Sequence, residues 1–299
     1  MKKFFALLLT LAMVLSLAAC GGKKEEAPAE EAKEPEQTET QESAESAVTT
    51  VTAGKLTVAT SPDFAPYEFY AIGEDGTPTL AGFDVALAGY IADYLGLELE
   101  MVTVDFDGVL TELQTKSADL GMAGLSPDPK RTSIMDFSDI YYEGGQSFVT
   151  VAGNEDLFPT LEDTNKAEYS IGAQTGSIQM DLANENSPDA DIIALPKVTD
   201  LISELLTGKL DGAYIETDVA KSYQKNYPEL EIVLDVPYDS EGSAIGVSKG
   251  NEALLAAVNE AVAAALSDGS METFVAEANE LASGEKYEGL LDANGQVQQ

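Results

Sequence analysis

The stretch 119–131 combines residue types that could bind the head group of an amino acid. Its apolar part, 120–123, predicts a short buried strand that ends at Gly124. Ser126 and Arg131 follow just beyond the carboxyl end of that strand, where ligands bind in open α/β sheets. The Gly124 carbonyl, the Ser126 hydroxyl and the Arg131 guanidinium together suit an α-ammonium and an α-carboxylate. The alternative is a surface turn with a solvated arginine.

The composition excludes several other kinds of site. The 299 residues include no His, no Trp and one Cys, and their formal net charge is −37. Without His the commonest general base and metal ligand is missing, and a single Cys allows no internal disulfide or thiolate cluster. Nucleic acid needs a basic face, so it is not an expected partner. The acidic residues do not match the twelve-residue calcium loop, and no cofactor is expected.

The amino end predicts a secreted, lipid-anchored protein. Residues 1–19 combine a short basic start with an apolar core too short to span a membrane, which is typical of a signal peptide. The ending Leu17-Ala-Ala-Cys20 resembles a bacterial lipobox. That resemblance implies cleavage before Cys20 and its acylation, for example with palmitate, which would anchor the protein to the bilayer. The alternative is an ordinary signal peptide with an incidental cysteine.

Residues 20–54 predict a disordered acidic linker, because 21–54 hold nine Glu and three Lys without apolar periodicity. The folded part is expected from about Lys55. Two units of alternating strands and helices follow. In the first, helices are predicted to begin at Asp84 and Asp107, and in the second at about Ser177 and Thr199. The predicted strands are 55–59, 97–104 and 119–123 in the first unit, and 169–173, 191–195 and 211–215 in the second. A proline-containing loop is predicted at 61–69 and a turn at 73–79.

The two units repeat each other. Segment 113–124 aligns without a gap to segment 205–216, which gives Gly124 and Glu216 equivalent positions. A strand at 146–151 leads from the first unit to the second, and another at 242–248 precedes helices at 252–267 and 271–281. The late strand indicates that the carboxyl end completes the first lobe. Two crossings between the lobes would form a hinge.

From Lys55 to about Leu281 the chain resembles a bacterial solute-binding protein of the polar amino acid class, which serves an ABC importer. The motifs that carry this resemblance are Ala59-Thr-Ser-Pro-Asp-Phe-Ala-Pro-Tyr-Glu-Phe69, Gly82-Phe-Asp-Val-Ala-Leu-Ala, Asp105-Phe-Asp-Gly-Val-Leu, Leu120 to Arg131, Asp136-Phe-Ser-Asp-Ile-Tyr-Tyr142 and Asp268-Gly-Ser. The resemblance implies an α/β, two-lobe fold of the periplasmic-binding-protein type, with the ligand between the lobes. Lobe 1 is assigned to 55–146 with 240–299, and lobe 2 to 147–239.

The resemblance also implies roles for individual residues. Phe64 and Phe106 match aromatic residues that sandwich the ligand's side chain. Arg131 matches the guanidinium that holds the α-carboxylate, and Glu216 matches the acid that pairs with the α-ammonium. The free amides of a loop that opens a helix, and the positions that shape the side-chain pocket, complete the set. The expected ligand-binding residues are Ser61, Phe64, Phe106, Gly124, Leu125, Ser126, Arg131, Gln174, Thr175, Gly176, Ser177 and Glu216.

The leading hypothesis is therefore a monomeric receptor on the cell surface that captures a free amino acid and delivers it to ABC permease subunits. A polar or cationic ligand is favoured by the acids within 61–68 and 105–107. One alternative is an enzyme on the same fold, such as a lyase or a glycan-cleaving enzyme, with Glu68, Asp63 or Glu216 as acid or base. Another is a ligand-sensing surface lipoprotein that partners a sensor.

Overall fold

The computed structural model describes residues 48–73, 76–240 and 242–283, all within one compact unit that spans 45–299. The expected signal peptide 1–19, the acylation site Cys20 and most of the acidic linker lie outside the described residues. None of the helices within the described ranges is long and apolar enough to cross a membrane.

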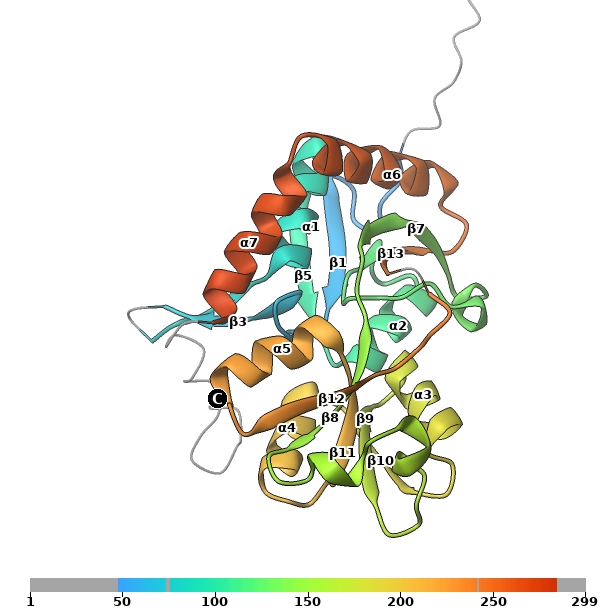
Figure 1. The fold of residues 1–299 in the computed structure, drawn as a ribbon. Helices are drawn as coiled ribbons and strands as arrows, with labels where there is room; N and C mark the ends of the chain where they lie inside the picture. The colour runs from blue at the N-terminus through green and yellow to red at the C-terminus, as the bar shows by residue number, and fades with distance from the viewer. Residues whose placement is uncertain (1–47, 74–75, 241, 284–299) are drawn as a thin grey trace, which may run out of the picture. The chain divides into compact units, whose positions relative to one another are not determined.

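The first sheet has five strands in the order β5-β1-β6-β13-β7. Strand β1 is parallel to β5 and to β6, whereas β13 is antiparallel to both β6 and β7. Helices α1, α2 and α6 pack against it, and α7 follows α6 (Figure 1). The bounds are β1 Lys55–Thr60, β5 Glu98–Thr103, β6 Leu120–Gly121, β7 Met135–Tyr142, β13 Ser243–Ser248, α1 Phe83–Leu95, α2 Phe106–Gln114, α6 Glu252–Ser267 and α7 Ser270–Ala282.

The second sheet has five strands in the order β10-β9-β11-β8-β12. Strand β9 is parallel to β10 and β11, and β8 is antiparallel to β11 and β12. The bounds are β8 Gln146–Val151, β9 Ser170–Gln174, β10 Asp191–Leu195, β11 Gly212–Glu216, β12 Leu230–Asp235, α3 Ile178–Asn186, α4 Val198–Leu206 and α5 Thr217–Asn226, with short 3₁₀ helices η1 Pro129–Arg131, η2 Glu155–Leu157 and η3 Leu161–Thr164.

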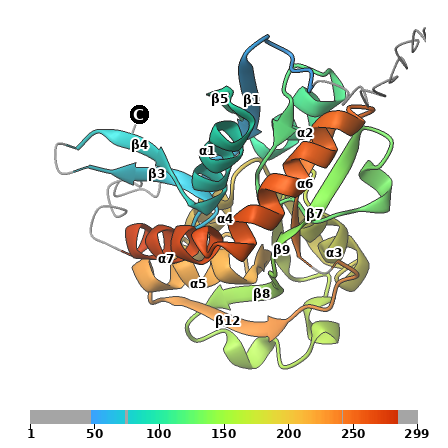
Figure 2. The same ribbon diagram turned by 90° about the horizontal axis from the view of Figure 1, so that it is seen from above.

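The chain passes between the two sheets twice, after β7 and after β12, and β13 returns to the first sheet. This confirms the expected α/β fold with two lobes. We call the first sheet with α1, α2, α6 and α7 lobe 1, and the second sheet with α3, α4 and α5 lobe 2. The crossings fall at 143–145 and 236–242. The lobe bounds assigned from the sequence remain a proposal. At its carboxyl end α7 lies beside α5 (Figure 2), where the Asn226 side chain donates to the Ala282 carbonyl at 2.9 Å.

A small three-stranded sheet was not predicted. Strands β2 Asp63–Phe64, β3 Glu68–Ile72 and β4 Pro78–Ala81 form an antiparallel meander where the sequence predicted a loop and a turn. The two prolines of the loop lie outside the paired residues of β2 and β3, so they remove no ladder hydrogen bond. Phe64 and Phe69 are both buried, so apolar side chains of this short sheet pack into the core.

The predicted internal repeat is confirmed by matching hydrogen bonds. The Asp119 amide donates to the Thr57 carbonyl, and the Asp119 carboxylate accepts from the Thr57 amide at 2.9 Å. Asp211 makes the same two bonds with Ser170, the carboxylate accepting at 2.8 Å. Each aspartate therefore joins the start of its unit's third strand to its first strand. These bonds fix the position of β6 and β11 against the first strand of each unit, and therefore help to position the residues that follow them.

Two helix caps differ from the sequence prediction. The residue before α1 is Gly82, and the residue before α2 is Asp105, so Asp84 and Asp107 lie in the first turns instead. Asp84 cannot cap because its carboxylate accepts hydrogen bonds from the Tyr141 hydroxyl and the Gly124 amide. In contrast, Ser177 caps α3 as expected.

The start of the folded part also differs from the prediction. Residues 49–54 were assigned to the linker, yet the Val51 amide donates to Asp119 at 2.7 Å and the Thr49 carbonyl accepts from Asn251 at 2.8 Å. The segment is held on lobe 1 in part because Asp119 has a second carboxylate oxygen to offer.

Replacing Asp119 with alanine is expected to destabilise the protein by about 2–3 kcal/mol, because two backbone amides lose a charged acceptor. Urea unfolding followed by circular dichroism measures this. The control is Asp93→Ala, at an exposed site of α1, which should change the free energy of unfolding by less than about 0.5 kcal/mol. Equal effects of the two substitutions would contradict the assigned role of Asp119.

Candidate functional site

Arg131 ends the 3₁₀ helix η1, whose start is capped by the Asp128 side chain. Its side chain is buried and crosses from lobe 1 to lobe 2, where a terminal nitrogen donates to the Gly176 carbonyl at 3.0 Å. The guanidinium carbon lies 5.6 Å from the centre of the Phe106 ring. Burial lowers the pKa of Arg131, but a guanidinium remains charged at neutral pH. Its remaining N–H groups can therefore donate hydrogen bonds to an anionic ligand.

The loop 174–177 leads into α3 beside Arg131. The Ser177 hydroxyl accepts from the Met180 amide at 3.2 Å and donates to the Gln174 carbonyl at 2.7 Å. The prediction of free amides along this loop is wrong in part. The Thr175 amide donates to the Leu195 carbonyl and the Ser177 amide to the Gln174 carbonyl. The loop presents the amide of Gly176, a residue with positive φ, together with the positive end of the α3 dipole.

Gly124 lies in lobe 1, just beyond β6, with φ of 55°. A Cβ atom there would lie 2.6 Å from Cε1 of Phe64, so the position has no room for a side chain. Its amide donates to Asp84 at 3.1 Å. The next residue, Leu125, accepts from the Ala244 amide through its carbonyl. Ser126, like Gly124 and Leu125, lies in a segment with little solvent exposure.

Glu216 ends β11 in lobe 2 and caps α5, accepting from the Val219 amide at 2.8 Å. Its other oxygen accepts from the Gly145 amide at 3.3 Å, a long bond that leaves capacity for a further donor. A Cβ atom on Gly144 would lie 2.9 Å from this oxygen and 3.0 Å from the Tyr67 hydroxyl, so both groups converge there. Burial raises the pKa of Glu216 to about 7, and the Asp218 charge adds to the rise. The site would therefore favour an incoming cation.

Glu68 was not among the expected ligand-binding residues, although it is one of the acids within 61–68 that favoured a polar or cationic ligand. It is fully buried, and neither carboxyl oxygen receives a hydrogen bond from a described donor. Its side chain lies against that of Asp84, which accepts from the Tyr141 hydroxyl at 2.7 Å. Burial raises the pKa of Glu68 well above its ordinary value and that of Asp84 to about 6. Burial and the neighbouring acid thus both favour the protonated form of Glu68.

Glu68 lies on the same face of the small sheet as Phe64. The two residues stand opposite each other in the β2–β3 ladder, so their side chains project to one side. Phe64 packs against Tyr67, with ring centres 5.3 Å apart, and against the position of Gly124. Asp84, which contacts Glu68, binds the Gly124 amide. These contacts place Glu68 in the same neighbourhood as the predicted ligand residues of lobe 1.

Ser61 and Gln174 meet at a further acid, Asp63. The Ser61 hydroxyl donates to one carboxylate oxygen at 2.7 Å, and the Gln174 side chain donates to the other at 3.2 Å. Ser61 belongs to lobe 1 and Gln174 to lobe 2, so this contact bridges the cleft. Burial raises the pKa of Asp63 to about 6.

The structure thus gathers the predicted residues into three groups of contacts. Arg131, Phe106 and Gly176 form one group, Ser61 and Gln174 meet through Asp63, and Gly124 lies against Phe64. Glu216 contacts the Gly144–Gly145 crossing, apart from the group around Arg131. Within the described part of the chain, the site holds four buried carboxyl groups and one buried guanidinium: Asp63, Glu68, Asp84 and Glu216 against Arg131. Its composition favours a ligand with net positive charge.

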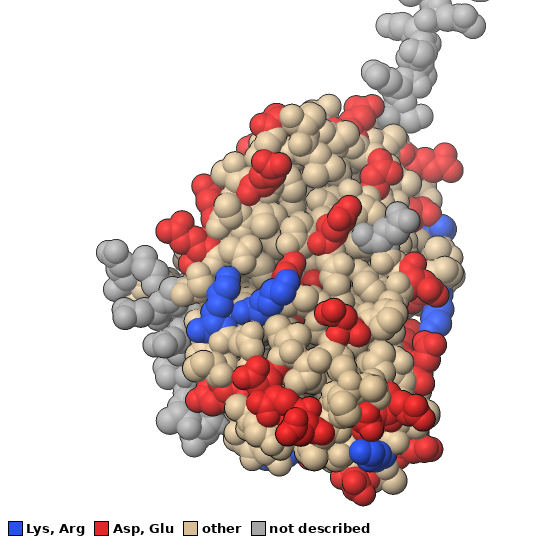
Figure 3. Space-filling view, viewed as in Figure 1, with Lys and Arg blue, Asp and Glu red and all other residues tan. Residues whose placement is uncertain are grey.

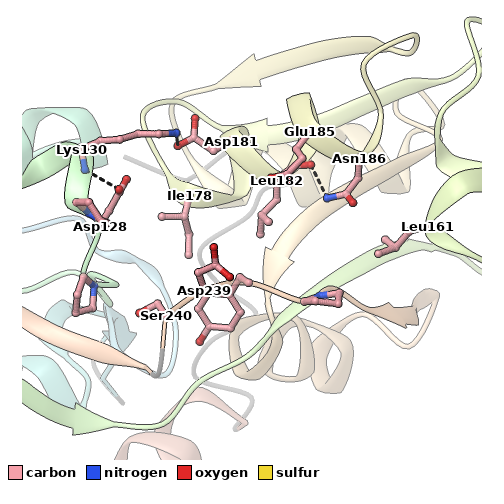
Figure 4. A pocket seen from close by; sticks show the side chains of 14 residues that line it. Asp128, Lys130, Leu161, Ile178, Asp181, Leu182, Glu185, Asn186, Asp239 and Ser240 are labelled. Carbon is pink, nitrogen blue, oxygen red and sulfur yellow. Dashed lines mark hydrogen bonds and ion pairs between the residues drawn. The ribbon is translucent and has the colours of Figure 1, made fainter.

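A separate hollow of about 660 Å³ lies to the side of this site, between the loop 127–130, α3 and the crossing at 237–240 (Figure 4). Ile178 and Leu182 line it from α3. At its rim the Lys130 ammonium contacts the Asp181 carboxylate at 2.8 Å and so links the lobes. It is lined by none of the predicted ligand residues.

The surface of the protein is also negatively charged, like the buried acids. Figure 3 shows carboxylates spread over the visible face, with a small group of basic side chains over α5. The electrostatic field of these carboxylates attracts cations at long range.

The family model described as bacterial extracellular solute-binding proteins, family 3, matches residues 56–277. The chain belongs to this family. Solute binding, and not catalysis, is therefore its class of function, and the enzyme alternative is set aside.

Individual members of the family are similar over most of the chain. The arginine-binding extracellular protein ArtP of Bacillus subtilis strain 168 is 30% identical over 256 residues, which cover 84% of this chain and 88% of ArtP. The amino acid ABC transporter substrate-binding protein AbpA of Streptococcus pneumoniae Canada MDR_19A, solved with bound L-arginine, is 31% identical with a TM-score of 0.74, covering 78% of this chain and 97% of AbpA.

An ancestral arginine-binding protein is also similar and has been solved with two ligands. With arginine its identity is 32% and its TM-score 0.67, over 75% of this chain and 97% of that one. In its complex with glutamine the identity is 32% and the TM-score 0.69, and the match covers 76% of this chain and 98% of that one.

Replacing Gly124 with alanine is expected to destabilise the protein by about 2–4 kcal/mol, since the Cβ atom would meet the Phe64 ring and the backbone is left-handed. Gly96→Ala is the matched control. Gly96 has φ of 66°, and a Cβ atom there would have no neighbour within 4 Å, so only the backbone cost of about 1 kcal/mol should appear. Urea unfolding distinguishes the two, and equal losses would contradict the close approach of Phe64.

Proposed function

We propose that the protein binds a cationic amino acid, L-arginine, between its lobes and delivers it to the permease of an ABC importer. The observation that carries this proposal is the buried Glu68 carboxyl group, which has no described hydrogen-bond donor. Unpaired buried polar groups are rare because leaving one costs about 1–3 kcal/mol, and more when it is charged. A ligand that supplies donors removes this cost.

A guanidinium is the donor that suits this position. It is planar, stays charged and offers several N–H groups to carboxylate oxygens. Glu68 and Asp84 lie side by side and can ionise together only when a cation is present. Phe64, on the same face as Glu68, gives the flat cation an aromatic surface on which to stack.

The head group of the amino acid would lie at the other groups of the site. Arg131 and the start of α3 would bind its α-carboxylate, through the guanidinium's remaining donors and the Gly176 amide. Glu216, the Gly124 carbonyl and the Ser126 hydroxyl would bind its α-ammonium. A zwitterion that leaves water needs both charges paired in this way, because each unpaired charge costs several kcal/mol.

The relatives support the same ligand. ArtP is named for arginine, and AbpA and the ancestral protein have been solved with arginine bound. The glutamine complex of the ancestral protein makes a neutral polar amino acid the competing ligand. Glu68, the buried acid without a described donor, favours arginine over it.

The anchoring of the protein is part of the proposal. The signal sequence 1–19 and the lipobox-like ending at Cys20 support export and acylation. An acyl anchor and the acidic linker would keep the binding domain near the permease on the outer face of the membrane.

L-Arginine and L-citrulline have nearly the same shape but differ in charge, so together they test the role of Glu68. Calorimetry should show arginine binding at least about 100-fold more tightly than citrulline, as expected for charge-assisted bonds. Glu68→Gln should weaken arginine binding about 10- to 100-fold and change citrulline binding by less than about threefold. Glu98→Gln, at an exposed acid, is the control and should change neither. Equal affinities for the two ligands in the wild type would contradict the proposal.

Arg131→Ala should abolish binding of both ligands, because both carry the same α-carboxylate. Arg131→Lys should retain weak binding, since an ammonium cannot form two parallel bonds. Thermal unfolding of the empty Arg131→Ala variant should stay close to that of the wild type. A variant that still binds either ligand tightly would show that Arg131 does not hold the carboxylate.

The affinity for arginine should rise with pH between 5 and 8. Burial raises the pKa of Glu216 to about 7, and an ammonium partner would lower it in the complex. Binding then requires loss of the Glu216 proton, so affinity falls about tenfold per unit below pH 7. Calorimetry in buffers of different ionisation enthalpy should detect proton release at pH 7. Glu216→Gln should reduce that proton release. An affinity for arginine that does not change between pH 5 and pH 8 would contradict the assignment.

A further inference from the structure

Asp63 lies in β2 of the small sheet, whose strands β3 and β4 contact α1 of lobe 1, but it accepts hydrogen bonds mainly from lobe 2. Its Oδ2 atom accepts from the Val198 amide and from the Gln174 side chain, and its backbone carbonyl accepts from the Tyr223 hydroxyl at 3.0 Å. Its Oδ1 atom is held within lobe 1, by the Ser61 hydroxyl at 2.7 Å. Three donors from lobe 2 thus converge on one residue of lobe 1.

The bond to Val198 is a helix cap supplied by the opposite lobe. Val198 is the first residue of α4, and the preceding residue, Lys197, makes no side-chain cap. The first amides of a helix have no acceptor within the helix, and aspartate is among the best residues to supply one. The cap is therefore made when the lobes are together and is lost when they part.

Asp63 differs in burial from the charged pairs that bridge the lobes at the surface. Lys130 and Asp181 are 72% and 52% exposed, and Lys197 and Asp105 are 45% and 47% exposed. Ion pairs as exposed as these contribute little, because water and salt screen them. Asp63 is 7% exposed, so its bonds are shielded. Since both of its oxygens already have donors, Asp63 is not a free partner for a ligand's charge.

We propose that Asp63 is a positioning residue that latches the two lobes around the bound amino acid, by capping α4 of the opposite lobe and orienting the Gln174 side chain. The inference rests on the proposed function, in that it names what holds the ligand-bound arrangement. Its consequence is kinetic. The latch forms after the ligand has entered, so it governs release and leaves capture unchanged.

Stopped-flow measurement of arginine binding and release by the full-length chain tests this inference. Asp63→Ala should raise the release rate about 10- to 100-fold and change the association rate by less than about threefold. Asp63→Asn should restore slow release to within about fivefold of the wild type, because asparagine caps helices nearly as well. The control is Asp181→Ala, which removes the exposed bridge to Lys130 and should change release by less than about threefold.

Hydrogen exchange of the Val198 amide gives a readout that a merely structural role would not change. In the wild type saturated with arginine, this amide should exchange slowly, although it is the first of its helix. In Asp63→Ala saturated with arginine it should exchange fast, while amides in the middle of α4 keep their protection. Asp63→Asn should keep Val198 protected.

The inference is overturned if Asp63→Ala releases arginine at the wild-type rate, if Asp181→Ala accelerates release as much, or if Val198 exchanges fast in the saturated wild type. The wild-type measurements also separate the two proposals. Absence of arginine binding by the wild type would contradict the proposed function itself. Normal binding with an unchanged release rate in Asp63→Ala would overturn the latch alone.

Discussion

The site between the lobes depends on an imbalance of buried charge. Asp63, Glu68, Asp84 and Glu216 are buried there with Arg131 as the accompanying cation. In a medium of low dielectric constant such acids either keep protons or acquire a positive partner. Burial raises the pKa of all four, which favours the first course. A ligand with two positive groups and one negative group offers the second course, and this is the basis for assigning a cationic amino acid.

The fold brings these charges together by repetition. Asp119 and Asp211 fix the third strand of each unit in the same way, so residues beyond β6 and β11 emerge at equivalent places in the two lobes. Arg131 follows β6 and Glu216 ends β11, so each lobe contributes one buried charged residue at this edge. In the proposed function, the two lobes bind the two ends of a zwitterion from two sides. Asp63 adds a contact between lobes that requires no ligand charge.

Much of this arrangement could be predicted from the sequence, and the exceptions have physical reasons. The repeat and the positions of Arg131 and Glu216 are local features, visible in the spacing of short segments. Strands β2 and β3 were missed because Pro62, just before β2, and Pro66, between the two strands, suggested a loop. The partnership of Asp84 with Glu68 was missed because an acid near a helix start usually caps it. The contact between Asp63 and Val198 joins residues 135 positions apart, which no local pattern reports.

A crystal structure of the complex with L-arginine tests the central claim most directly. The account predicts the α-carboxylate within hydrogen-bonding distance of Arg131, the α-ammonium at Glu216 and the guanidinium at the Glu68 carboxyl group. It also predicts that Asp63 remains bonded to Val198 in that complex. A guanidinium bound away from Glu68, with that carboxyl group still lacking a donor, would contradict the claim that buried acids select the ligand.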